Sequence, residues 1–222
     1  MLWWLGAALF LWLALREVYY GFVPKPGFAE PQKIFGPYLV VTLALACACA
    51  YPPLRTWRFE QFLTRQARIL SGVEQAKVHC NTFFDTAVDP MALASGHADF
   101  ESGRIVFQKP WCSVLRRYLR HPEKLDREGI ISVQMFAHEA MHVRGERNEA
   151  VTECQAIQRY LRAARLLGIP EASARAGGML YYQSLYQQRQ QIGGMQAAYY
   201  SDQCAPGKRL DERLPDSLWA SP

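Results

Sequence analysis

Apolar residues are concentrated in two uncharged runs near the start of the chain. The first covers residues 1–15 and the second covers residues 35–51. Each approaches the roughly 20 apolar residues that a helix needs to cross a bilayer. The second run shows no polar stripe at the helical repeat, which argues against the alternative of a core helix in a soluble protein. The pattern therefore predicts one or two transmembrane helices.

Flanking residues extend this prediction to a helical hairpin. Trp3 and Trp4 precede most of the first run, and Tyr19 and Tyr20 follow it, as in interfacial aromatic belts. Pro52-Pro53 is expected to end the second helix. We expect a membrane anchor over residues 1–54, formed by helices at 1–23 and 35–51.

Residues 55–222 have the pattern of a soluble domain. A helix is expected from Trp57 to Ser71, followed by a short strand at 75–80 and a hairpin at 98–107 whose turn contains Ser102-Gly103. Three helices are then expected at 127–144, 149–167 and 170–192, with Gly193-Gly194 ending the last and an irregular tail from about residue 199. Strands followed by helices predict an α+β domain.

Charge narrows the partners but leaves the membrane face open. The net charge of +5 is only mildly basic, which argues against nucleic acid as a partner. Four arginines close behind the second apolar run favour a cytosolic domain by the positive-inside tendency: Arg55, Arg58, Arg65 and Arg68. Four cysteines in the domain could instead form two disulfides in an extracytoplasmic compartment: Cys80, Cys112, Cys154 and Cys204.

The residues from His138 to His142 form the pattern HExxH within the predicted helix 127–144. Side chains four residues apart lie on one helix face, so both imidazoles can reach one zinc ion at about 2.0–2.1 Å. Glu139 lies beside them and can accept a proton from a water whose pKa the ion lowers toward about 7. The motif therefore indicates zinc-dependent hydrolysis.

The third ligand is less clearly indicated. A catalytic zinc has three protein ligands and one open position. Gly145 matches the glycine of the longer pattern HExxHxxGxxH, but Asn148 occupies its ligand position, and asparagine binds zinc poorly. Glu149 and Glu153 lie four apart on the next predicted helix, with Asn148 as its N-cap. Either acid could complete the site.

These residues resemble the gluzincin metallopeptidases, especially the membrane-associated branch in which HExxH is followed by E-x-x-x-D. The resemblance implies a zincin-like fold, a zinc cofactor and a peptide or protein substrate. It also implies that Glu149 binds the ion. Glu153 stands where that branch has aspartate, and would orient the ligands.

Residues 138–156 also resemble a group of small uncharacterised bacterial proteins with the pattern HEAxHxRGxxxEAxxEC. The likeness covers most of residues 75–222. It implies disulfides between Cys80 and Cys112 and between Cys154 and Cys204.

The gluzincin resemblance also suggests where a substrate lies. Those enzymes run an edge strand antiparallel to bound peptide, and the corresponding strand here would contain Ile105, Val106 and Phe107. An ordinary core hairpin explains the same residues equally well. His97, beside the hairpin, could line the cleft.

An oxyanion stabiliser is also expected, since acyl-transfer chemistry develops negative charge on the carbonyl oxygen. Tyr181, Tyr182 and Tyr186 on the last predicted helix are candidates.

The sequence thus predicts a membrane-anchored zinc metallopeptidase with Glu139 as general base. The alternative is a non-catalytic, membrane-tethered binding module whose zinc site is structural or vestigial, with Cys154 as the nearest extra ligand. An intramembrane protease is not supported. The apolar part of the motif helix is too short to span, and charged residues flank it.

Overall fold

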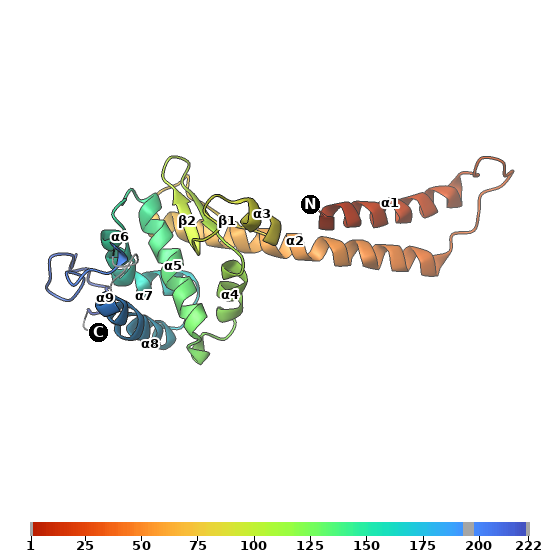
Figure 1. The fold of residues 1–222 in the computed structure, drawn as a ribbon. Helices are drawn as coiled ribbons and strands as arrows, with labels where there is room; N and C mark the ends of the chain where they lie inside the picture. Colours follow the sequence, from red (N-terminus) through yellow and green to blue (C-terminus); the bar gives the residue numbers. More distant parts are fainter. Residues whose placement is uncertain (1, 193–197, 221–222) are drawn as a thin grey trace. The chain divides into compact units, whose positions relative to one another are not determined.

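A computed structural model describes residues 2–192 and 198–220 of the chain (Figure 1). The chain forms two compact units, Met1–Phe59 and Glu60–Pro222. Each unit is described by itself below. The fold is α+β, because a three-stranded sheet accompanies a larger number of helices.

The first unit contains helix α1 (Leu2–Phe22) and the beginning of helix α2 (Gly36–Ser71). The two helices lie against each other, since a Cβ atom on Gly6 would lie 3.1 Å from the Cys49 sulfur. The amide of Phe35 donates a hydrogen bond to the Glu17 carboxylate near the connecting loop. Both helices are long and apolar enough to cross a membrane, and only 6% of each apolar window is buried. That exposure is the opposite of what a soluble core helix shows.

The prediction that Pro52-Pro53 ends the second helix is wrong, as is the separate helix from Trp57. α2 continues through both prolines to Ser71. Each proline removes one backbone donor and crowds the preceding turn, which costs about 3 kcal/mol or more in a helix interior. Helical residues continue on both sides of the two prolines. The Thr56 hydroxyl donates to the Pro52 carbonyl within the next turn.

The second unit is built around a small mixed sheet of strands β1 (Lys77–Cys80), β2 (Gly96–Asp99) and β3 (Arg104–Phe107). The order is β1-β3-β2, with β1 parallel and β2 antiparallel to β3. The hairpin between β2 and β3 forms as predicted, and Gly103 in its turn has a φ of +68°. β3 is thus the central strand of the sheet, and β1 and β2 lie at its two edges.

Helix α5 (Arg127–Val143) lies at the centre of the second unit (Figure 1). It contacts the sheet through β2 and β3 and packs against the helices around it. Nearly all its residues from Gly129 onward are buried. The surrounding helices are α4 (Trp111–Tyr118), α6 (Glu149–Gln158), α7 (Tyr160–Leu166) and α8 (Glu171–Tyr181).

The predicted helices differ from the observed ones mainly in their continuity. The predicted helix 149–167 breaks at Arg159 into α6 and α7. The predicted helix 170–192 consists of α8, a π-helical segment (Tyr182–Tyr186) and α9 (Gln187–Ile192), while Gly193-Gly194 lies outside the described residues. Two short helices were not predicted: α3 (Phe83–Val88) and α4. A short 3₁₀ turn (Pro122–Lys124) precedes α5.

Two disulfides crosslink the second unit, Cys80–Cys112 and Cys154–Cys204. They are the pairs that the bacterial resemblance implied. Such bonds persist in oxidising compartments and are rare in the cytosol of most organisms, so they favour an extracytoplasmic location. Cys47 and Cys49 in α2 are free thiols.

Candidate metal centre

The HExxH motif occupies the last two turns of α5, and the chain then turns back to bring α6 alongside. Gly145 has a φ of +115°, a backbone conformation that side chains other than glycine rarely adopt. Asn148 caps α6 as predicted, accepting a hydrogen bond from the amide of Val151. Because α6 starts directly after this turn, its first acidic residue, Glu149, faces the two histidines.

Three side chains converge at one point. Nε2 of His138 and Nε2 of His142 lie 3.0 Å apart, and Oε2 of Glu149 lies 3.2 Å from the first and 3.3 Å from the second. Both histidines are buried, and Glu149 is partly exposed. Within residues 2–192 and 198–220, this is the one group of three or more ligating side chains close enough to hold a metal ion.

The other nitrogen of each imidazole is already engaged. Nδ1 of His138 lies 2.7 Å from a carboxylate oxygen of Glu153, and Nδ1 of His142 lies 2.8 Å from the Glu146 carbonyl oxygen. A carbonyl can only accept, so Nδ1 of His142 carries the proton and its Nε2 presents a lone pair. The Tyr181 hydroxyl donates to the second oxygen of Glu153. Such partners fix the orientation of metal-binding imidazoles.

Without a metal ion, protons balance the charges of this cluster. Burial disfavours the charged form of His138, but its hydrogen bonds to Glu149 and Glu153 outweigh burial and raise the pKa of His138 from 6.5 to about 10. Burial likewise opposes ionisation of Glu149, yet its contacts with His138 and His142 lower the pKa of Glu149 to about 2. Metal-free protein therefore holds an imidazolium beside a carboxylate.

The cluster fits a zinc ion. Ligand atoms at about 2.0–2.1 Å from a tetrahedral centre stand about 3.3 Å from one another, close to the three distances seen here. Two imidazole nitrogens and one carboxylate oxygen are ligands that zinc accepts. With both Nδ1 atoms engaged elsewhere, the facing Nε2 atoms need a cation or proton between them. His138, His142 and Glu149 could hold the ion, with Glu153 behind them.

Glu139 lies beside the cluster in a buried position. Its Oε2 atom has no hydrogen-bond partner among the described residues. Burial raises the pKa of Glu139, although the charges of His138 and His142 act in the opposite direction. An unpartnered buried carboxylate oxygen is costly to maintain, and such groups recur where chemistry uses them.

Strand β2 passes close to Glu139 at Gly96. A Cβ atom at this position would lie 3.1 Å from the Val106 carbonyl oxygen and 3.2 Å from the Met135 sulfur. It would also stand 3.4 Å from Oε1 of Glu139. Glycine therefore lets the strand approach α5, and this places the sheet edge directly beside the motif.

The prediction that Ile105, Val106 and Phe107 form the substrate edge strand is wrong. These residues belong to β3, which is central in the sheet and paired on both sides. The edge near the motif is β2. The error arose because β1 pairs with the far side of β3, a long-range pairing with no local signal in the sequence.

His97 is also placed differently from the expectation. Side chains alternate along a strand, so Gly96 faces α5 and His97 faces the opposite side of the sheet. There His97 lines a polar cavity of about 380 Å³ together with His79, Asp85 and Asp89. It does not line the metal cleft.

The three tyrosines predicted as oxyanion stabilisers have other partners. Tyr181 donates to Glu153, Tyr182 to the Cys204 carbonyl and Tyr186 to the Ser201 carbonyl. They hold the C-terminal tail and the outer shell of the cluster.

Tyr199, in the tail, approaches the cluster instead. Its ring stacks on that of His138, with centroids 5.9 Å apart. Burial raises the pKa of Tyr199, and the nearby carboxylates of Glu149, Glu139 and Glu153 raise it further. The sequence placed this residue at the start of an irregular tail, so no periodicity pointed to it.

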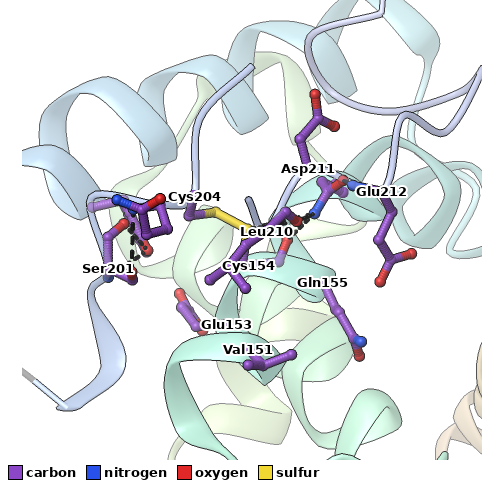
Figure 2. The surroundings of a disulfide bond; sticks show 12 residues. Val151, Glu153, Cys154, Gln155, Ser201, Cys204, Leu210, Asp211 and Glu212 are labelled. Atoms are coloured by element: carbon purple, nitrogen blue, oxygen red, sulfur yellow. Dashed lines mark hydrogen bonds between the residues drawn. A yellow bond between two sulfur atoms is a disulfide. The ribbon is translucent and has the colours of Figure 1, made fainter. Parts of the chain in front are cut away.

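The disulfide between Cys154 and Cys204 ties this tail to α6 (Figure 2). Cys154 directly follows Glu153 in α6, and Cys204 lies five residues beyond Tyr199. The Cys154 sulfur is bonded to that of Cys204, so Cys154 is not available as the fourth zinc ligand of a structural site. The crosslink instead joins the two segments that carry the outer shell and the stacked tyrosine.

Comparisons with protein-family models, with curated proteins and with solved structures found no match.

The geometry assigns different roles to the two acids of α6. We expect about one zinc per chain in the purified wild type, as measured by mass spectrometry of the metal content. His142→Ala and Glu149→Ala should lose the metal because each removes a ligand. Glu153→Ala should keep it with about 10–100-fold weaker affinity, since it removes only the support of His138.

Glu171→Ala is the matched control, because this acid lies on α8 in exposed ion pairs away from the cluster. It should bind zinc like the wild type. Loss of zinc from Glu153→Ala together with retention in Glu149→Ala would reverse the assignment.

Metal-free protein should lose stability as the pH rises. The folded pKa of His138, about 10, lies above its ordinary value of 6.5. Its stabilising contribution is therefore complete below pH 6.5 and is lost as the pH rises through about 10. The melting temperature of the chelator-treated full chain in detergent should fall across this range. The decline should be shallower in His138→Gln, and equal declines in both proteins would contradict the charge pair.

Proposed function

We propose that this chain is a membrane-anchored zinc metallopeptidase. The observation that carries the proposal is the buried, unpartnered oxygen of Glu139 beside three converging ligands. Three protein ligands leave a zinc ion one open position, as in catalytic sites. A structural site would be closed by a fourth protein ligand, and the cluster offers none within the described residues.

Each residue has a chemical task in this proposal. A zinc ion, when bound, polarises a carbonyl and lowers the pKa of water. Glu139 accepts a proton from the attacking water, whose oxygen bonds to the peptide carbonyl carbon. As the C–N bond breaks, Glu139 returns that proton to the leaving amine. We propose that Tyr199, whose ring stacks on that of His138, donates a hydrogen bond to the carbonyl oxygen as it gains charge.

The sheet supports an extended peptide as the substrate. β2 is an edge strand, and such strands present unpaired backbone groups that can pair with a further chain. Its first residue, Gly96, lies beside Glu139. A peptide added antiparallel to β2 would carry its backbone past the cluster. This arrangement is the reason to propose a zincin-like fold.

The location follows from two further observations. The two apolar helices support anchorage in a cell membrane, and the two disulfides support placement of the catalytic unit on its extracytoplasmic side. The arginines that follow the second apolar run favour the opposite side, but they are indirect indicators, whereas the crosslinks require an oxidant.

Glu139→Gln should remove peptidase activity without removing the metal. We expect kcat on a quenched-fluorescence peptide library to fall about 10²–10⁴-fold, because glutamine cannot accept the proton. Zinc content should stay at the wild-type level, since Glu139 is not a ligand.

Glu146→Gln is the control, since only the backbone carbonyl of Glu146 contacts a histidine. Full activity in Glu139→Gln would end the assignment of the base. Zinc-loaded wild type that cleaves no peptide would favour the binding-module alternative.

Tyr199→Phe should lower kcat by about 10²–10³-fold with little change in KM, because the ring still stacks but the hydroxyl is gone. Tyr200→Phe is the matched control, since the Tyr200 hydroxyl accepts a hydrogen bond from Arg189 of α9. Steady-state kinetics on one peptide would measure both. Unchanged kcat in Tyr199→Phe would show that the ring only packs against His138.

A further inference from the structure

Large apolar side chains are exposed along one short segment of the second unit. They belong to α3 and the turn that follows it, and their exposed fractions run from 52% to 105%: Phe83, Phe84, Val88, Met91 and Leu93. Elsewhere in the described part of this unit, exposed large apolar residues are scattered singly. Single exposed residues are ordinary on soluble proteins, whereas a contiguous group marks an interaction surface. We name this segment, residues 83–93, the apolar segment.

The apolar segment is held in place by polar contacts that leave its apolar side chains outside. Thr82 and Asp85 form a capping box at the start of α3. The Asp89 carboxylate accepts hydrogen bonds from the Asn81 side chain and the Met91 amide. The Lys109 amide donates to the Thr86 hydroxyl. The exposed side chains are thus presented on an ordered scaffold.

The place of the apolar segment in the second unit follows from the contacts of β1 with the end of α2. Going along the strand, Ala76 contacts Arg68, Val78 contacts Thr64 and Cys80 contacts Glu60. The strand therefore runs back along the helix toward Glu60, the first residue of the unit. α3 begins three residues after Cys80, so the apolar segment lies at the end of the unit where the anchor is joined.

Few residues separate Glu60, where the second unit begins, from the second apolar run. The second apolar run ends at Tyr51, nine residues before Glu60. Nine residues of helix extend only about 14 Å, so the chain between the apolar run and Glu60 is short. Basic residues, which can pair with phosphate headgroups, lie between the apolar run and the second unit and beside α3. Arg55 and Arg58 lie between the run and Glu60, and the Lys109 ammonium lies 5.9 Å from the Phe83 ring centroid.

We infer that the apolar segment docks on the phospholipid bilayer that holds the anchor, with Phe83, Phe84 and Val88 inserted among the headgroups and upper acyl chains. Aromatic and aliphatic side chains flanked by basic residues are suited to that depth. The second unit is then held at the membrane by two attachments, the covalent helix and this contact. The inference requires the apolar helices to lie in a bilayer and is independent of peptidase activity.

The test places a photoreactive benzoylphenylalanine at position 84 of the full chain. The protein is reconstituted in nanodiscs of phosphatidylcholine and phosphatidylglycerol, irradiated and analysed by mass spectrometry. Phe84 is 79% exposed, so the substitution leaves the core intact. Ile69, 64% exposed near the C-terminal end of α2 and nine residues beyond Glu60, is the matched control. Val41 in the apolar run is the positive control for lipid contact.

We expect lipid adducts at positions 84 and 41 and none at 69. Adducts at 41 but none at 84 would overturn the docking. Chain-to-chain adducts at 84 would assign the apolar segment to contact with a second copy, which also overturns it. Adducts at both 84 and 69 would show non-specific lipid contact and likewise contradict the inference.

Discussion

Nε2 of His138 and Nε2 of His142 face each other at 3.0 Å, and this close approach requires a positive charge between them. Each ring has its other nitrogen engaged, by a carboxylate for His138 and by a backbone carbonyl for His142. Facing lone pairs repel, so a positive charge must lie between them. The Glu149 carboxylate completes the pocket for that charge, and burial of both histidines makes the arrangement costly to leave empty.

The surrounding structure supports this pocket in successive layers. Glu153 orients His138, and Tyr181 in turn donates to Glu153. The disulfide at Cys154 then ties α6 to the tail (Figure 2). Tyr199 of this tail stacks on His138. Helix α6 thus supplies the candidate ligand Glu149, the carboxylate that orients His138 and the cysteine that holds the tail. Removing the crosslink would free the tail and loosen the support of Tyr199 at once.

Much of the site could be predicted because its signals are local. The spacing of His138 and His142 places both on one helix face, and the cap at Asn148 starts the next helix where Glu149 can reach them. The sequence does not distinguish Glu149 from Glu153 as the third ligand, because the choice depends on the tight turn at Gly145. Pro52-Pro53 predicts a helix end, because proline disrupts a helix interior. α2 nevertheless continues through both prolines, with helical residues on either side of them.

Non-local features could not be predicted from the sequence. β3 looked like an edge strand because nothing near it reveals that β1 pairs with its other side. Tyr199 reaches the cluster only through the folding of an irregular tail, for which no periodicity exists. Short α3 was missed because six residues give too little pattern, although its capping box was present at Thr82.

We propose that His138, His142 and Glu149 hold one zinc ion that keeps an open position. Anomalous diffraction at the zinc edge, from crystals of the zinc-loaded full chain, would locate the ion. We expect one peak within bonding distance of Nε2 of both histidines and of the Glu149 carboxylate, with the fourth position free of protein atoms. A peak elsewhere, or one enclosed by four protein ligands, would contradict it.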